Sequence, residues 1–218
     1  MDNKIQTSES MKVGILLALA GGFFDIYSYV ARGKVFANAQ TGNMVLFGLK
    51  IAEGDLKGVI YYAVPIMSFV AGIILAEVIR NRYKENTNIH WRQIVLIVEM
   101  LVVFAVMFIP RGQPDLIVNA AISFVCSVQV QSFRKLKGSG FATTMCTGNL
   151  RSATDALFNY RKTKDRTMLK KSIDYYIIIG VFILGAIAGG ILTKAVGYMA
   201  VGFTLVPIGA AVGVMAKK

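Results

Sequence analysis

The sequence predicts an all-α, polytopic membrane protein, because it is apolar overall, contains several long apolar stretches, and keeps most of its charge between them. Of its 218 residues, 55% are hydrophobic and 17% are charged, which departs from the composition of soluble domains. A helix that crosses about 30 Å of hydrocarbon needs roughly 20 residues. Stretches that reach or approach this length lie at residues 13–31, 59–79, 94–109, 116–133, 173–195 and 198–216. We therefore expect one membrane domain over residues 1–218 with about six transmembrane helices.

The placement of charge favours a membrane protein over a nucleic-acid-binding protein. The formal net charge is +12, and positive residues concentrate at 80–92 and 161–171, between apolar stretches. Such clustering is the loop bias of membrane topology, so no nucleic-acid partner is expected. The two cysteines, Cys126 and Cys146, lack paired spacing. Neither a disulfide nor a metal site nor a cofactor is therefore expected.

The chain contains an internal repeat. The tripeptide Thr-Gly-Asn at residues 41–43 recurs at residues 147–149. Each copy follows an apolar stretch and a short basic segment, and each precedes a short helical segment and a long apolar stretch that contains glycine. The ordered neighbours indicate a duplication, with halves at about 11–110 and 115–216.

The short segments 38–52 and 143–158, which carry the tripeptides, are predicted to be re-entrant. If the basic segment 80–92 is cytoplasmic, the basic segments at 134–137 and 161–171 are cytoplasmic too. Residues 143–158 then enter and leave on one face, and pseudo-symmetry predicts the same for residues 38–52 on the opposite face. Three spans per half make the halves inverted, with both termini cytoplasmic. A rival topology, in which 38–52 crosses, gives seven spans and an external N-terminus.

The Thr-Gly-Asn segments are candidate binding elements. Threonine caps helix N-termini, glycine allows close approach of the backbone, and asparagine both donates and accepts hydrogen bonds. A helix that begins inside the membrane directs its free N–H groups at the contents of a cavity, as the broken helices of transporters do. The alternative is that these residues only pack two short helices together. The candidate residues in the two segments are Asn38, Gln40, Thr41, Gly42, Asn43, Thr144, Thr147, Gly148 and Asn149.

Polar side chains within the first and fifth spans are further candidates. Asp25 lies near the middle of the first span, where a lipid-facing carboxylate costs several kcal/mol, so it must face protein or water. It is either a proton- or cation-linked carboxylate in a cavity, with Ser28 on the same helix face, or a carboxylate held by a neighbouring Thr-Gly-Asn segment. In the fifth span the polar side chains either line the same cavity or hydrogen-bond between helices. These are Asn119, Ser123, Ser127 and Gln131 at four-residue spacing and, on another face, Gln129.

The sequence resembles the YoaK family of bacterial membrane proteins. The resemblance rests on residues 22–28, 35–43 and Gly48 in the first half. In the second half it rests on Val128-Gln129, Thr143-Thr144 and residues 147–150. Val130 is a departure, because asparagine is expected there. The resemblance implies a multi-pass protein of the bacterial inner membrane and gives weight to Asp25 and both tripeptides. It supplies no substrate, since the family is a domain of unknown function.

Two functions of different classes fit these patterns. The first is a transporter or channel for a small solute or proton, with both tripeptides and Asp25 around a central site. Helix N-termini favour an anionic group and Asp25 favours a cation or proton, which together suit a zwitterion or a proton-coupled anion. The second is a non-transporting membrane scaffold or stress-related protein, in which glycine pairs such as Gly185 and Gly189 form homo-oligomer faces. An enzyme is not expected, because spacing identifies no nucleophile with a base.

Overall fold

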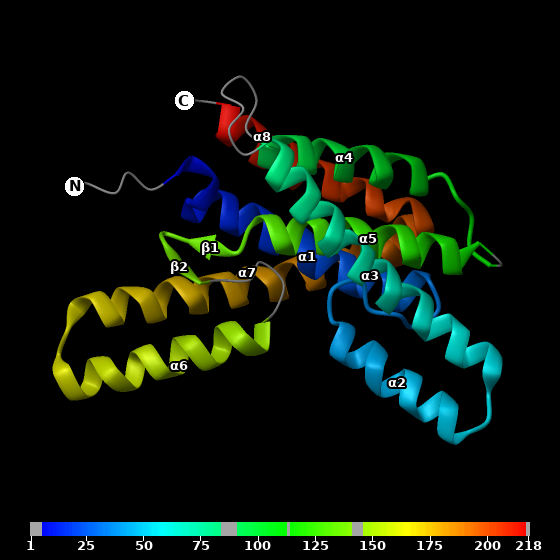
Figure 1. Ribbon diagram of the computed structural model, residues 1–218, viewed down its shortest axis with the longest axis horizontal. Helices are drawn as coiled ribbons and strands as arrows, with labels where there is room; N and C mark the ends of the chain where they lie inside the picture. Colours follow the sequence, from blue (N-terminus) through cyan, green and yellow to red (C-terminus); the bar gives the residue numbers. More distant parts are fainter. Residues whose placement is uncertain (1–5, 84–90, 113, 141–145, 217–218) are drawn as a thin grey trace.

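The computed structural model describes residues 6–83, 91–112, 114–140 and 146–216, and it is almost entirely helical (Figure 1). The elements are η1 (Thr7–Glu9), α1 (Met11–Ala31), α2 (Gln40–Ala52), α3 (Leu56–Tyr83), α4 (Trp91–Val106), α5 (Asp115–Ser132), β1 (Lys135–Leu136), β2 (Ser139–Gly140), α6 (Cys146–Thr163), α7 (Arg166–Val196), η2 (Gly197–Thr204) and α8 (Leu205–Ala216). The strands β1 and β2 form one short antiparallel pair. Apart from this pair, the all-α prediction is confirmed for the described residues.

Four helical stretches of the described chain are long and apolar enough to cross a membrane: Met11–Ala31, Leu56–Tyr83, Asp115–Ser132 and Arg166–Ala216. The last contains α7, η2 and α8, and its direction changes at Gly197, where φ is +68°. The helix α4 has 16 residues, a length of about 24 Å at about 1.5 Å per residue. The sequence predicts about six spans. Four stretches meet the length and hydropathy of a span, and one of them, residues 166–216, contains the two successive helices α7 and α8.

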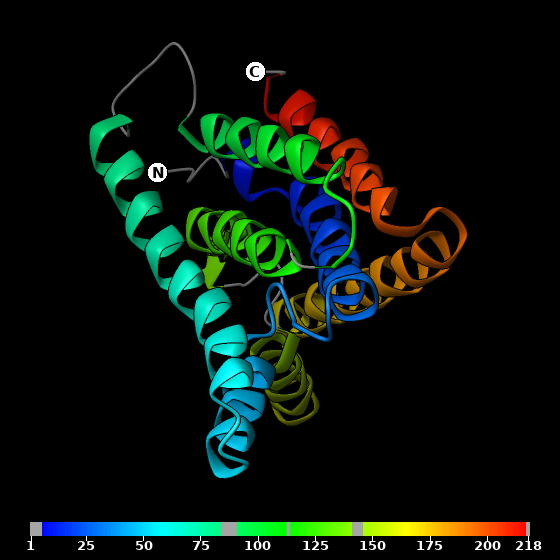
Figure 2. The same ribbon diagram turned by 90° about the vertical axis from the view of Figure 1, so that its right-hand side faces the viewer.

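The helices α1 and α5 form the centre of the molecule, and the other long helices surround them (Figure 2). Within the most apolar 18-residue window of each stretch, 67% of the window is buried in α1 and 61% in α5. The corresponding share is 22% for both α3 and the stretch 166–216. The outer surfaces of these peripheral helices expose large apolar side chains such as Ile74, Val78, Leu184 and Ile187. A buried polar centre within an apolar exterior is the arrangement that lipid requires.

Glycine allows the close packing of the two main helix pairs. The helix α7 packs against α1 and α3 packs against α5. A Cβ atom on Gly185 would collide with the carbonyl oxygen of Leu19, and one on Gly72 would collide with that of Phe124. A Cβ on Gly189 would also press on Phe23. These glycines therefore pack helices together within the bundle and are not free for an oligomer face.

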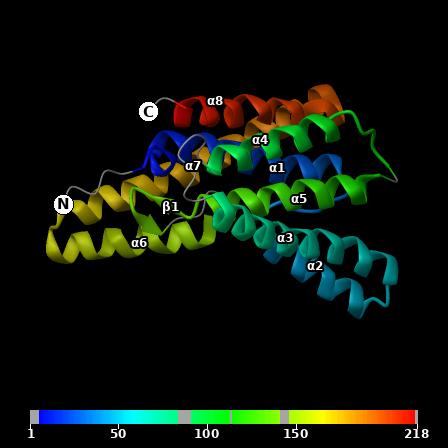
Figure 3. The ribbon, with the colours of Figure 1, turned by 45° about the horizontal axis from the view of Figure 1, so that its top comes forward.

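The two short helices begin near the middle of the molecule and run outwards to opposite ends (Figures 1 and 3). The helix α2 has 13 residues, about 20 Å, which is too short to cross a bilayer. Each short helix is joined to the next by a tight turn. Gly54 and Lys164 adopt φ of +70° and +58°, and the aspartates that follow them cap α3 and α7. The basic segment 161–171, expected as a loop, is mostly helical, since α6 ends at Thr163 and α7 begins at Arg166.

Candidate functional site

A cavity of 810 Å³ lies between the two short helices. Its lining comes from α1, the segment before α2, the first turns of α2 and α6, and the middle of α3 and α7. The polar part of the lining lies at the start of α2 and α6 and on α1. It consists of Asp25, Asn38, Gln40, Thr41, Cys146, Thr147 and the backbone of Gly148. Both Thr-Gly-Asn segments therefore face one cavity, and Asp25 faces it too.

The rest of the cavity wall is apolar and aromatic. The helix α3 contributes Ile66, Phe69, Val70 and Ile73, and α7 contributes Phe182. The rings of Tyr29 and Phe36 also line the cavity and stack with their centroids 5.0 Å apart. The site therefore combines a polar region at the two helix N-termini with an apolar region large enough for the body of a small solute.

Asp25 ties α1 to the segment that precedes α2. Its Oδ1 accepts the backbone N–H of Asn38 at 2.6 Å and that of Ala39 at 3.3 Å, and the residue is only 7% exposed. The amide of Asn38 in turn donates to the carbonyl of Gly21 at 3.3 Å, while its Oδ1 is buried without a hydrogen-bond partner among the described parts of the chain. The carboxylate is held by the first Thr-Gly-Asn segment and also lines the cavity, so both interpretations of Asp25 describe part of its surroundings.

Asn43 and Gln40 fasten the start of α2 to the chain before it. Asn43 accepts the N–H of Phe36 at 2.9 Å and donates to the Phe36 carbonyl at 2.7 Å and to Gln40 Oε1 at 2.9 Å. Gln40 donates to the carbonyl of Ala37 at 2.9 Å. Gly42 lies against the Phe36 ring, 2.8 Å from the position of a Cβ. In this tripeptide Thr41 lines the cavity, whereas Gly42 and Asn43 shape the backbone that presents it.

The second tripeptide reaches the cavity from α6. Thr147 and Gly148 line the cavity with Cys146, at the first turn of this helix. Asn149 is buried, with 3% of its surface exposed. Thr144 lies outside the described residues. In α2 the first-turn N–H groups of Gln40 and Gly42 donate to the carbonyls of Asn38 and Ala39. The positive dipole ends of the two helices still favour negative charge at the cavity.

The polar side chains of α5 point away from the cavity. Asn119 donates to the carbonyl of Arg32 at 2.7 Å, and Ser127 donates to the carbonyl of Phe124 at 2.7 Å, beside Gly72. Ser123 is buried. None of these three, nor Gln129, is among the residues that line this cavity. Ser28 on α1 likewise turns back to the carbonyl of Phe24 at 2.9 Å.

Glu99 of α4 is a buried carboxylate that sequence reasoning left without a role. It is 1% exposed. The side-chain amide of Gln129, oriented with its nitrogen towards Glu99, donates to the two carboxylate oxygens of Glu99 at 2.9 and 3.1 Å. Cys126 lies within electrostatic reach of both Glu99 and Asp25, and Asn38 lies beside its thiol. A cluster of polar groups thus extends from the cavity wall through α5 to α4.

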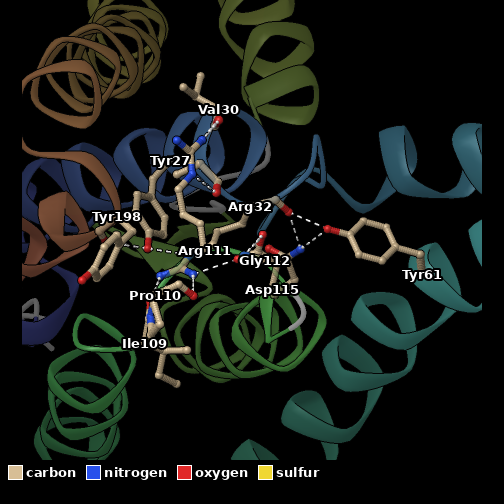
Figure 4. A network of polar contacts seen from close by, with 12 residues as sticks. Tyr27, Val30, Arg32, Tyr61, Ile109, Pro110, Arg111, Gly112, Asp115 and Tyr198 are labelled. Atoms are coloured by element: carbon tan, nitrogen blue, oxygen red, sulfur yellow. Dashed lines mark hydrogen bonds and ion pairs between the residues drawn. The ribbon is translucent and has the colours of Figure 1, made fainter.

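Arg32 is the second residue whose role the sequence did not reveal. Expected in a basic loop, it is fully buried. Its guanidinium donates to Tyr27 Oη at 2.8 Å, to Asp115 Oδ1 at 2.8 Å, and to the carbonyls of Ile109 and Pro110 at 2.6 and 3.0 Å (Figure 4). This network joins the end of α1 to the start of α5. Tyr27 is five residues away, but Ile109, Pro110 and Asp115 are 77 to 83 residues away in the chain, so no local pattern marks the network.

Comparison with known proteins gives the same class of molecule. The family model described as "Protein of unknown function (DUF1275)" matches residues 13–215. The chain is 28% identical over 178 residues to "UPF0700 transmembrane protein YoaK" of Bacillus subtilis (strain 168), which covers 79% of each chain. No solved structure matches. The resemblance seen in the sequence is confirmed: this chain is a membrane protein that belongs to the DUF1275 family of unknown function.

Proposed function

We propose that this protein is a transporter or channel for a small solute and that the 810 Å³ cavity is its binding site. One observation carries the proposal. The N-termini of α2 and α6, which run to opposite ends of the molecule, line one cavity together with Asp25. Half-helices whose N-termini meet inside the membrane are how many transporters bind their substrates.

Two inverted halves are part of this proposal, and the packing supports them. The helix pairs match: α1 packs on α7 as α5 packs on α3, α2 on α3 as α6 on α7, and α1 on α8 as α5 on α4. The helices α1 and α5 run in opposite directions (Figure 1). The turns match as well. Asp55 accepts the N–H of Gly58 at 2.9 Å at the start of α3, and Asp165 accepts that of Thr167 at 2.8 Å at the start of α7.

The topology that follows has six passes, formed by α1, α3, α4, α5, α7 and the η2–α8 segment, with α2 and α6 as re-entrant helices. The start of α1 and the end of α8 lie at the same end of the molecule (Figures 1 and 3). The α6–α7 turn lies at that end too, with its basic residues. The positive-inside rule therefore assigns this end to the cytoplasm of an inner membrane.

The topology has a direct test in single-cysteine labelling. In a chain whose Cys126 and Cys146 are replaced by serine, Lys137→Cys and Lys164→Cys are expected to react with an impermeant maleimide from the same face. Glu53→Cys, in the α2–α3 turn, is expected to react from the other face. Labelling of Lys137→Cys and Lys164→Cys from opposite faces would refute the inverted-halves arrangement.

The cavity also suggests what it binds. Two helix N-termini favour an anionic group, Asp25 favours a proton or a cation, and the aromatic wall accommodates an apolar body. The solute we propose is a small zwitterion or an anion that moves with a proton. The scaffold alternative has less support, because Gly72, Gly185 and Gly189 are covered within the chain. Gly213 of α8, in contrast, has open space around its Cβ position.

Solute-driven proton movement tests the proposed function. Proteoliposomes loaded with a pH-sensitive dye are exposed to a panel of amino acids and small carboxylates, and the pH of the lumen is recorded. At least one solute is expected to change this pH with the wild-type protein but not with Asp25→Asn. The matched control is Asp155→Asn, which alters an exposed carboxylate on α6. If solutes move equally well with Asp25→Asn, Asp25 has no part in the mechanism.

A further inference from the structure

A second cavity, of 390 Å³, lies at the end of the molecule where α3 ends, α4 begins and α5 ends. It shares no lining residue with the central cavity. Four basic side chains line it: Arg80 of α3, Arg92 of α4, and Arg134 and Lys135 after α5. Trp91 lines it as well. We call it the basic cavity.

Positive charge exceeds negative charge in the basic cavity. Among the residues that the structure describes, Glu9 is the one acidic residue in its lining. Glu77 stands beside it, 3.3 Å from Arg80 and 3.6 Å from Arg134. Four basic and two acidic groups leave a local charge of about +2 by their ordinary ionisation at pH 7. A concave surface with this excess favours an anion.

The basic side chains differ in how firmly they are held. Arg92 is fixed, because it donates to the carbonyl of Ser132 at 2.8 Å and pairs with Glu9 at 3.4 Å, and its guanidinium lies 5.1 Å from the Trp91 ring centroid. The side chain of Arg134 is 50% exposed, and Lys135 is exposed as well. A rigid arginine at the base of the cavity and exposed cations at its mouth suit a ligand that arrives from the surface.

The surroundings of the basic cavity favour a lipid over a free ion. Trp91 stands at the first residue of α4, a position typical of tryptophan at the membrane interface, and it packs against Ala76 and Val95 with 7% of its surface exposed. One face of α3 leads from Arg80 through Glu77 and Ile73 to Phe69 at helical spacing, and the last two line the apolar wall of the central cavity. An inorganic phosphate would use only the cations, whereas a phospholipid would use the cations and this apolar face.

We propose that the basic cavity binds the phosphate-bearing headgroup of an anionic phospholipid, with an acyl chain along α3. Arg134 and Lys135 contact the phosphate, and Arg92 supplies fixed positive charge behind it. Basic pockets between transmembrane helices at a cytoplasmic face are known to bind such headgroups. This proposal does not depend on whether the central cavity transports a solute.

The chain carries its own reporter for this site, because Trp91 is its one tryptophan. The protein is reconstituted into vesicles of brominated phosphatidylcholine with increasing brominated phosphatidylglycerol, and quenching of Trp91 gives the relative association of the two lipids. We expect a preference of about three- to tenfold for phosphatidylglycerol, which corresponds to about 0.7–1.4 kcal/mol in total. Equal quenching by both lipids would overturn the proposal.

Variants separate the site from general surface charge. The double change Arg134→Gln, Lys135→Gln is expected to remove most of the preference, while Lys170→Gln, Lys171→Gln removes two exposed charges from α7 and leaves it intact. The conservative pair Arg134→Lys, Lys135→Arg is expected to retain it. Glu77→Gln removes a negative charge beside the cavity and is expected to raise the preference for phosphatidylglycerol. A loss of folding could not raise this preference. If the control pair lowers the preference as much as the first pair, or if millimolar inorganic phosphate abolishes it, the headgroup site is refuted.

Discussion

Asp25 accepts the backbone N–H of Asn38 across 2.6 Å, so a carboxylate of the first helix holds the chain just before α2 begins. The same carboxylate lines the central cavity. Stability and function at this residue can therefore be separated by experiment.

Asp25→Asn keeps an oxygen that can accept the N–H groups of Asn38 and Ala39, but it carries no charge. Its thermal stability in detergent is expected to lie within about 1 kcal/mol of the wild type, the difference between a neutral and a charge-assisted hydrogen bond. Asp25→Leu leaves both N–H groups unpaired and is expected to lose about 1–3 kcal/mol. If both variants melt at the wild-type temperature, Asp25 does not hold the segment.

Within the first tripeptide, Asn43 and Thr41 are expected to behave differently. Asn43→Ala removes the hydrogen bonds to Phe36 and Gln40 from a fully buried position, so it is expected to destabilise the protein by about 1–3 kcal/mol. Thr41→Ala removes a hydroxyl from the cavity wall and is expected to change solute movement with little effect on melting temperature. Thermal melts and liposome assays on the same preparations compare them, and a reversed pattern would contradict the assignment.

Arg32 is expected to be the most sensitive basic residue to neutralisation. Arg32→Gln leaves Asp115 and the carbonyls of Ile109 and Pro110 without their donor, and breaking a buried ion pair costs about 3–5 kcal/mol. The neighbouring Lys34→Gln changes an exposed side chain and is the matched control. Unfolding in detergent, followed by the accessibility of Cys126 to a thiol reagent, measures both. Similar losses for the two variants would show that the Arg32 network is not a main tie.

The glycines at the two main helix pairs are expected to resist substitution equally. Gly72→Ala and Gly185→Ala each place a Cβ against the backbone of the facing helix, and each is expected to cost at least about 1–3 kcal/mol. Gly48→Ala is the control, because nothing lies within 4 Å of its Cβ position and alanine favours the helix by about 0.5–1 kcal/mol. Tolerance of one change but not the other would show that the two helix pairs are not equivalent in packing.

The two turn aspartates give stability a defined dependence on pH. Hydrogen bonds from Gly58 and Lys50 hold the pKa of Asp55 below its usual value, and those from Thr167 do the same for the pKa of Asp165. Because both pKa values are lowered by folding, their contribution is complete above the unfolded pKa of about 3.9 and is lost as the pH falls through the lower folded values. Melting temperature between pH 7 and pH 3 is expected to fall less steeply for Asp55→Asn, Asp165→Asn, and an unchanged slope would refute the role of these caps.

Much of the site could be predicted from the sequence because its signals are local. The repeated tripeptide and an aspartate within an apolar stretch mark positions that lipid does not tolerate, and the structure brings Asp25, Thr41 and Thr147 to one cavity. The polar residues on α5 did not indicate from the sequence whether they line the cavity. Whether Asn119 faces a cavity or the carbonyl of Arg32 depends on the neighbouring helix.

Arg32 and Glu99 are buried charged residues whose partners could not be predicted from the sequence. Their environments are formed by contacts that are distant in sequence, such as Asp115 with Arg32 and Gln129 with Glu99. Hydropathy and spacing describe one segment at a time. They indicate that a buried charge needs a partner, but they do not identify the segment that supplies it.

The carboxylate of Asp25 makes the two halves unequal in charge at the cavity. The first residue of α5, Asp115, is the only acidic residue in that helix, and it is paired with Arg32 far from the cavity lining. The N-termini of α2 and α6 both line the cavity, but α1 supplies a carboxylate there and α5 does not. For the solute passage proposed above, the field in the cavity is stronger on the side of α1, so the free-energy profile across the cavity is asymmetric between the two halves.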